Sequence, residues 1–114
     1  MKISKDCDAL ICVLYREYLT RRTKGDSIEL SSYFADDANI RDQFMPKWRV
    51  DDIANLCWRL YNHGLLDVTP GDDKANNVCL TEDGLIYMEE RFPMGLKAVL
   101  EHLGQLAALI VPWL

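Results

Sequence analysis

Apolar residues recur along this chain with two different periods, and the changes of period mark the expected elements. Helical spacing runs from about Ser4 to Thr23 and again from Val50 to His63. After Gly64 the spacing changes to the strand-like alternation of apolar and polar residues, which turn-forming residues at 70–77 interrupt and which ends at Leu80. The pattern predicts two helices, a pair of strands joined by a turn, and further helices.

The first helix is expected to bury one stripe, formed by Ile11, Leu14, Tyr15, Tyr18 and Leu19. Ser4 or Asp6 can cap its start, and Gly25 is a natural residue for its end. The alternation in Ser27–Leu30 predicts a short strand, and Ser31 or Ser32 can start a helix through Tyr33 and Phe34. Residues 37–45 are ambiguous, because helically spaced apolar residues are followed at once by Pro46.

The helix that begins at Val50 has the clearer pattern. Its expected inner stripe is Val50, Ile53, Leu56, Cys57 and Leu60. Gly64 stands where a helix commonly ends in the left-handed conformation. Thr81 can cap the helix that follows the strands, and Pro93 ends or kinks that helix near Arg91.

A last helix is expected from about Met94 to Val111. Its apolar residues step by three and four positions, an a/d pattern formed by Leu96, Val99, Leu103, Leu106 and Ile110. This stripe can pack onto its own domain or onto a second copy of the chain, and we expect a homodimer because the preceding elements already make a complete domain. The uncharged run of residues 103–114 is too short to span a bilayer, unless the chain is truncated at the start of a membrane segment.

From Ile28 to Arg91 the sequence resembles the winged helix-turn-helix superfamily. The resemblance is carried by the helix with Ile53, Leu56 and Leu60, by Gly64-Leu65-Leu66, by the turn at Pro70-Gly71, and by residues 78–84 entering the next helix. It implies a mainly α fold with a small β-hairpin wing and an extra C-terminal helix. The expected organisation is a winged-helix domain at residues 1–93 and an apolar dimerisation or packing helix at residues 94–114.

The resemblance also implies that the helix from Val50 lies in the major groove of double-stranded DNA, with the wing near phosphate. At 100° per residue its exposed face holds Asp51, Asp52, Asn55, Arg59 and Asn62. The expected base-contacting residues are Asn55, Arg59 and Asn62, and the expected phosphate contacts are Lys47, Arg49 and Lys74. The leading expectation is a small DNA-binding transcriptional regulator.

The charge distribution supports an alternative. Residues 1–50 carry nine Lys and Arg against eight Asp and Glu, whereas residues 51–114 carry four against ten. Asp51 and Asp52 are poor neighbours for phosphate, and Lys74 is outnumbered by Asp72 and Asp73. The alternative is a winged-helix module that binds protein through Trp58 and its acidic surface, since Trp is enriched at interface hot spots.

The remaining chemistry of the sequence points away from catalysis. Four cysteines show no paired spacing for zinc, and His63 and His102 have no local metal-ligand pattern. No nucleophile–base pair or phosphate-binding loop stands out, so we expect neither an enzyme nor a cofactor. The N-terminus lacks the apolar run of a signal peptide, and reduced thiols in a cytosolic protein are the economical interpretation.

Overall fold

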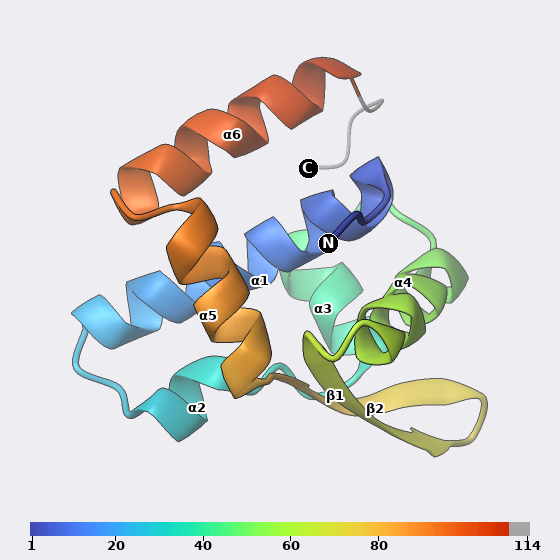
Figure 1. Cartoon of the computed structure of the whole chain (residues 1–114). Coiled ribbons are helices and arrows are strands. Elements are labelled where there is room, and N and C mark those ends of the chain that lie inside the picture. The colour runs from blue at the N-terminus through green and yellow to red at the C-terminus, as the bar shows by residue number, and fades with distance from the viewer. Residues whose placement is uncertain (110–114) are drawn as a thin grey trace.

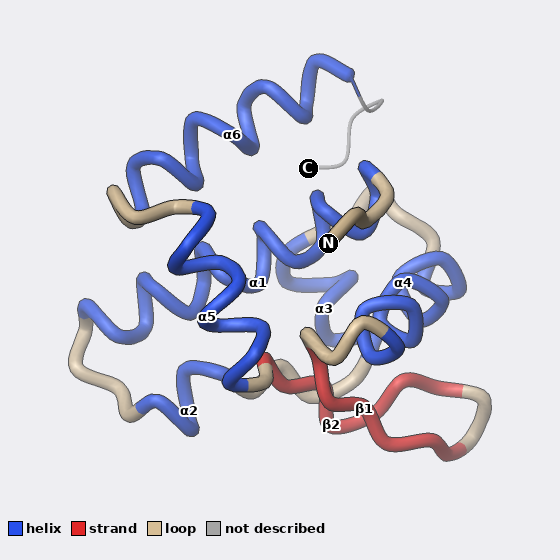
Figure 2. The backbone as a smooth tube through the Cα atoms, viewed as in Figure 1, coloured by secondary structure: helices blue, strands red, loops and turns tan. Residues whose placement is uncertain are grey.

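The computed structural model describes residues 1–109 and shows a mainly helical fold with one small β-hairpin (Figures 1 and 2). In chain order the elements are α1 (Lys5–Thr23), α2 (Ile28–Ser32), α3 (Asp37–Phe44), α4 (Val50–Asn62), β1 (Leu66–Gly71), β2 (Lys74–Leu80), α5 (Glu82–Arg91) and α6 (Leu96–Leu109). The two strands pair antiparallel. The predicted fold class, helices with a small hairpin, is confirmed.

Helix α1 is the centre of the core. The Ser4 hydroxyl caps it by accepting the N–H of Cys7. Every residue from Cys7 to Tyr15 is buried, so the helix is covered on all sides in this stretch. The prediction of one buried stripe was therefore too narrow, because a run that is apolar all round belongs to a helix surrounded by its own domain. Helices α2, α4, α5 and α6 all contact α1 (Figure 1).

The strand predicted at Ser27–Leu30 is wrong, because this segment begins the short helix α2. The Ser27 hydroxyl accepts the N–H of Leu30 and so caps the helix, which ends at Ser32 instead of continuing through Phe34. Strand-like pairing occurs a few residues later. Tyr33 forms an isolated bridge with Cys79, and Phe34 donates its N–H to the carbonyl of Val78.

Helices α3 and α4 follow as a pair. Residues 37–44, ambiguous in the sequence, are helical, because the Asp36 carboxylate caps them by accepting the N–H of Asn39. The predicted helix from Val50 is confirmed. Its inner residues Ile53, Leu56, Cys57 and Leu60 are buried, while Val50 is half-buried.

The hairpin is longer and its turn shorter than the composition of residues 70–77 suggests. The strands pair as far as Gly71 and Lys74, so only Asp72 and Asp73 form the loop, both with positive φ. Two-residue loops of this kind match the twist of the paired strands. The register slips between Asp67 and Thr69, and the additional residue on β2 is accommodated as a bulge at Asn77, whose φ is 51°.

Helix α5 is seated closely on the start of the hairpin. Thr81 caps it as predicted, accepting the N–H of Gly84 and donating to the carbonyl of Gly64. A Cβ added to Gly84 would lie 2.2 Å from the carbonyl oxygen of Leu65. Glycine at this position is therefore required by packing.

Helix α6 lies across α1, on the side away from the hairpin (Figure 1). Its residues Val99, Leu103 and Leu106 belong to the same buried cluster as α1.

Within residues 1–109, no helix combines the length and the apolar character needed to cross a membrane.

Candidate functional site

The outer face of α4 is the first candidate for an interaction surface. Asn55, Arg59 and Asn62, the predicted base-contacting residues, are exposed. Asp51 and Asp52 are exposed in the first turn of the same helix. The hairpin lies beside α4 (Figure 1). The exposed side of α4 together with the hairpin tip, Asp72 and Asp73, is here called the α4–hairpin face.

This face is acidic where α4 begins. A hollow of about 450 Å³ separates the first turns of α3 and α4 from the hairpin tip. Its charged lining residues are Asp37, Asp51, Asp72, Asp73 and Lys74. Phosphate brought into this hollow would meet several carboxylates and a single ammonium group.

Two of the four predicted phosphate-binding or base-reading cations here are already next to carboxylates. The guanidinium of Arg49 lies 3.5 Å from the carboxylate of Asp51, and the Lys74 ammonium lies 3.7 Å from that of Asp36. Lys47 and Arg59 have no ion pair within the described part of the chain. Both are exposed.

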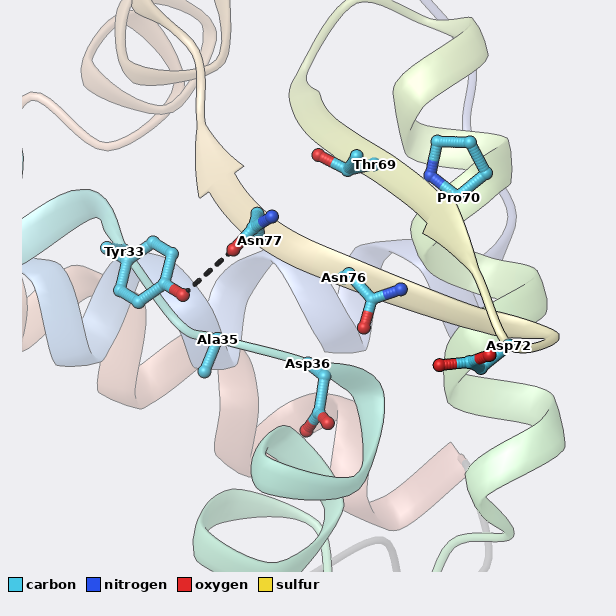
Figure 3. Close-up of a pocket in the computed structure, with 8 residues that line it drawn as sticks. All are labelled: Tyr33, Ala35, Asp36, Thr69, Pro70, Asp72, Asn76 and Asn77. Carbon is cyan, nitrogen blue, oxygen red and sulfur yellow. Dashed lines mark hydrogen bonds between the residues drawn. The ribbon is translucent and has the colours of Figure 1, made fainter.

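A second hollow of about 460 Å³ runs along the hairpin towards the start of α3 (Figure 3). The Tyr33 hydroxyl donates to the side-chain oxygen of Asn77 at 3.0 Å, which fixes the tyrosine against the bulge. Asp36 and Asp72 lie at the other end of the hollow (Figure 3). These groups offer hydrogen-bond acceptors and a carboxylate rim, but no arrangement of nucleophile and base.

Trp58 of α4 is the residue through which the alternative expectation would bind protein. It is half-buried and packs edge-to-face with Tyr61, with ring centroids 5.3 Å apart, and Tyr61 is 44% exposed. The side chain of Trp58 is therefore only partly covered by its own domain. Such a pair supplies a rigid, amphipathic contact of the kind that anchors protein interfaces.

The predicted contact stripe of the C-terminal helix lies differently from expectation. Val99, Leu103 and Leu106 are buried against the chain's own core, because α1 covers the side of α6 that carries them. Leu96 is half-buried, and Ile110 lies outside the described residues. Three of the five stripe residues therefore pack within one chain, which removes much of the reason for expecting a homodimer. The homodimer stays a prediction.

The predictions from sequence missed a cluster of ionisable side chains that the described residues form inside the fold. Asp8 of α1, Arg91 of α5 and His102 of α6 meet at a partly buried point, here called the Asp8 cluster. Arg91 donates through both of its terminal nitrogens to the two Asp8 oxygens, one of them at 2.8 Å. His102 Nε2 lies 2.8 Å from Asp8 Oδ2 and 2.9 Å from Arg91 Nη2.

The electrostatics of the Asp8 cluster favour the charged pair. Burial alone would raise the pKa of Asp8, but hydrogen bonds from Arg91 and His102 outweigh burial and hold that pKa below its ordinary value. The hydrogen bond to Asp8 raises the pKa of Arg91. Asp8 therefore stays ionised in the folded protein, and three helices are tied together at one carboxylate.

This cluster is a poor fit for a metal ion. Asp8, Cys12 and His102 each offer one possible ligand atom, all within 4.8 Å of one another. Arg91, however, already donates to both carboxylate oxygens, and burial raises the pKa of the Cys12 thiol, so that it stays protonated. A guanidinium group occupies the position that a cation would take.

One signal in the sequence could have pointed to the cluster. Asp8 is a charged residue at the start of the apolar run from Ala9 to Leu14, where an unpaired carboxylate would be costly. Its partners lie 83 and 94 residues away, so no local spacing links them.

Comparisons with protein-family models, curated proteins and solved structures gave no match to this chain.

Proposed function

We propose that the chain is a winged-helix domain whose α4–hairpin face binds a protein partner. Helices α3 and α4 correspond to the helix-turn-helix pair, and the hairpin that follows α4 corresponds to the wing. The bridge between Tyr33 and Cys79 stands where a short first strand joins the sheet of such a domain. The order of these elements supports the family assignment that the sequence motifs suggested.

The observation that carries the functional proposal is the position of the carboxylates. Asp51 and Asp52 are exposed in the first turn of α4, and Asp72 and Asp73 form the hairpin tip. In a winged helix these are the positions that approach the DNA backbone. Affinity for DNA depends largely on neutralised phosphates, so carboxylates here oppose binding.

The ion pairs on this face do not change that conclusion. Exposed pairs such as Arg49–Asp51 contribute only about 0–1 kcal/mol, so the arginine can be released to another partner. The carboxylate of Asp51 remains on this face when Arg49 pairs with another group. A protein surface with exposed cations and an apolar pocket for Trp58 and Tyr61 would be complementary to this face.

The proposal can be tested with a photo-crosslinking residue at Tyr61 and, as the control, at the exposed Leu100 of α6. In the producing cells we expect a discrete crosslinked protein from position 61 and none from position 100. Crosslinking to nucleic acid alone from position 61 would overturn the proposal.

A DNA-binding regulator is the second candidate. It is favoured by Asn55, Arg59 and Asn62, which stand exposed on successive turns of α4. In that case a fluorescent duplex would bind at low salt, and binding would fall steeply as salt rises and on Arg59→Ala. We expect no binding by the native chain, and a gain of low-salt binding when Asp51 and Asp52 are both changed to Asn.

A further inference from the structure

A groove of about 520 Å³ lies between α2, β2 and α5, away from the outer face of α4. Ile28 from α2 and Ile86 from α5 line it, together with the half-buried Leu85 and the buried Leu80. Ile28 is 56% exposed and Ile86 is 43% exposed. The groove therefore has an apolar interior with two aliphatic side chains that the described part of the chain leaves largely uncovered.

The rim of this α2–α5 groove carries one sign of charge. Glu29, Glu82 and Glu89 all line it and are all exposed, and no Lys or Arg is among its lining residues. None of the three glutamates forms an ion pair within residues 1–109. Aliphatic side chains between free carboxylates are complementary to a ligand that is both apolar and cationic.

The nearby arginine does not neutralise the rim. Arg21 points instead to the end of α2, where its Nη1 donates to the carbonyl of Tyr33 at 2.6 Å. Its guanidinium group lies over the ring of Phe34. Its Nε pairs with Glu17. Arg21 is engaged in holding α2 and the following segment in place, so it does not pair with the rim glutamates.

We propose that the α2–α5 groove docks an amphipathic segment of another protein, with Leu- or Ile-like side chains flanked by Lys or Arg. The apolar residues of the segment would insert between Ile28 and Ile86, and its cations would pair with Glu29, Glu82 and Glu89. A second copy of this chain is a poor occupant, because two such grooves would bring like charges together. No residue of α4 and neither residue of the hairpin tip lines the groove, so this proposal holds whether the α4–hairpin face binds protein or DNA.

Cys79 provides a reporter inside the groove. It lines the groove and is half-buried, whereas Cys7, Cys12 and Cys57 are buried. A thiol reagent should therefore label Cys79 first in the folded protein, and an occupant of the groove should slow that labelling. The reporter localises binding without any substitution in the groove.

The test uses a helical 14-residue peptide of Leu and Lys as the probe, and a Leu and Glu peptide of the same pattern as its control. We expect the Leu–Lys peptide to bind and to protect Cys79 from labelling, and the Leu–Glu peptide to do neither. Ile86→Asp and Glu89→Lys should each weaken binding about tenfold or more. Both positions are exposed, so the fold should tolerate the changes.

Leu100→Asp and Glu101→Lys on α6 are the matched control variants, since they replace an aliphatic residue by Asp and a Glu by Lys at exposed positions outside the groove. They should bind the Leu–Lys peptide as the native chain does. Equal weakening by the α6 variants would show non-specific attraction to an acidic protein and would overturn the proposal. Unchanged labelling of Cys79 with bound peptide, or self-association through the groove that Ile86→Asp abolishes, would also overturn it.

Discussion

Asp8 and His102 are separated by 94 residues in the sequence, yet Asp8 Oδ2 and His102 Nε2 lie 2.8 Å apart. Arg91 joins them through its contacts with both side chains. One carboxylate near the start of the chain is thus the common partner of α5 and α6. A charge in this position is stable only while its partners are present, because removing one of them leaves it partly buried and uncompensated.

Replacing Arg91 with Met should lower the free energy of unfolding by about 3 kcal/mol, since Asp8 would lose both guanidinium hydrogen bonds. Urea unfolding measures the change. The double variant Asp8→Leu with Arg91→Met should recover part of the loss, because no charge then remains to be compensated. If the single variant unfolds at the native midpoint, the cluster does not stabilise α5 and α6.

The stability of the protein should depend on pH through Asp8. The pKa of Asp8 in the folded state is lowered from 3.8, so its stabilising contribution is complete above about pH 5 and is lost as the pH falls through the lowered folded-state pKa. Between pH 5 and pH 2 the native chain should therefore lose more stability than Asp8→Asn. The comparison isolates Asp8, since the two chains differ only at this residue. Parallel pH profiles would contradict the prediction.

Gly84→Ala should destabilise the fold by about 1–3 kcal/mol, because the new Cβ would overlap the backbone oxygen of Leu65 and neither can move freely. Gly104→Ala is the control. Gly104 lies in the middle of α6, is exposed and has no atom within 4 Å of an added Cβ. That change should stabilise the protein by about 0.5–1 kcal/mol through helix propensity. Thermal unfolding of both variants would reveal opposite signs.

Asp73→Gly should stabilise the hairpin by about 1 kcal/mol, since Asp73 has a φ of 56° in a loop position that favours glycine. Asp73→Asn removes the same charge and keeps a side chain, so it separates relief of the backbone from relief of repulsion with Asp72. An equal gain from both variants, measured by urea unfolding, would assign the effect to charge instead of conformation.

The elements with local signals were predictable. Ser4 and Thr81 cap helices where the sequence placed caps, and Gly64 ends α4 in the left-handed region with a φ of 78°. The strand expected at Ser27–Leu30 is wrong because its alternation covers only four residues, and the Ser27 hydroxyl favours the start of a helix over a strand. The long strands of the hairpin were hidden by Pro70, Gly71 and two asparagines, which are tolerated because this is a two-stranded sheet with exposed edges and a bulge.

The surfaces were predictable only in part. The exposed face of α4 follows from helical spacing alone, and the structure leaves Asn55, Arg59 and Asn62 exposed as expected. The Asp8 cluster and the α2–α5 groove could not be found in this way, because both are assembled from elements far apart in the chain. The stripe on α6 was correctly identified as apolar, but its spacing does not reveal whether α1 or a second copy covers it.

The packing of α6 on α1 has a consequence for how the chain reaches its folded state. During synthesis α1 emerges well before α6, so the side of its apolar run at residues 9–14 that packs on α6 stays uncovered until α6 has been made. Closing contacts across such a sequence separation is slow, and a chain held in that interval exposes surface prone to aggregation. Deleting α6 would leave that side of α1 permanently exposed.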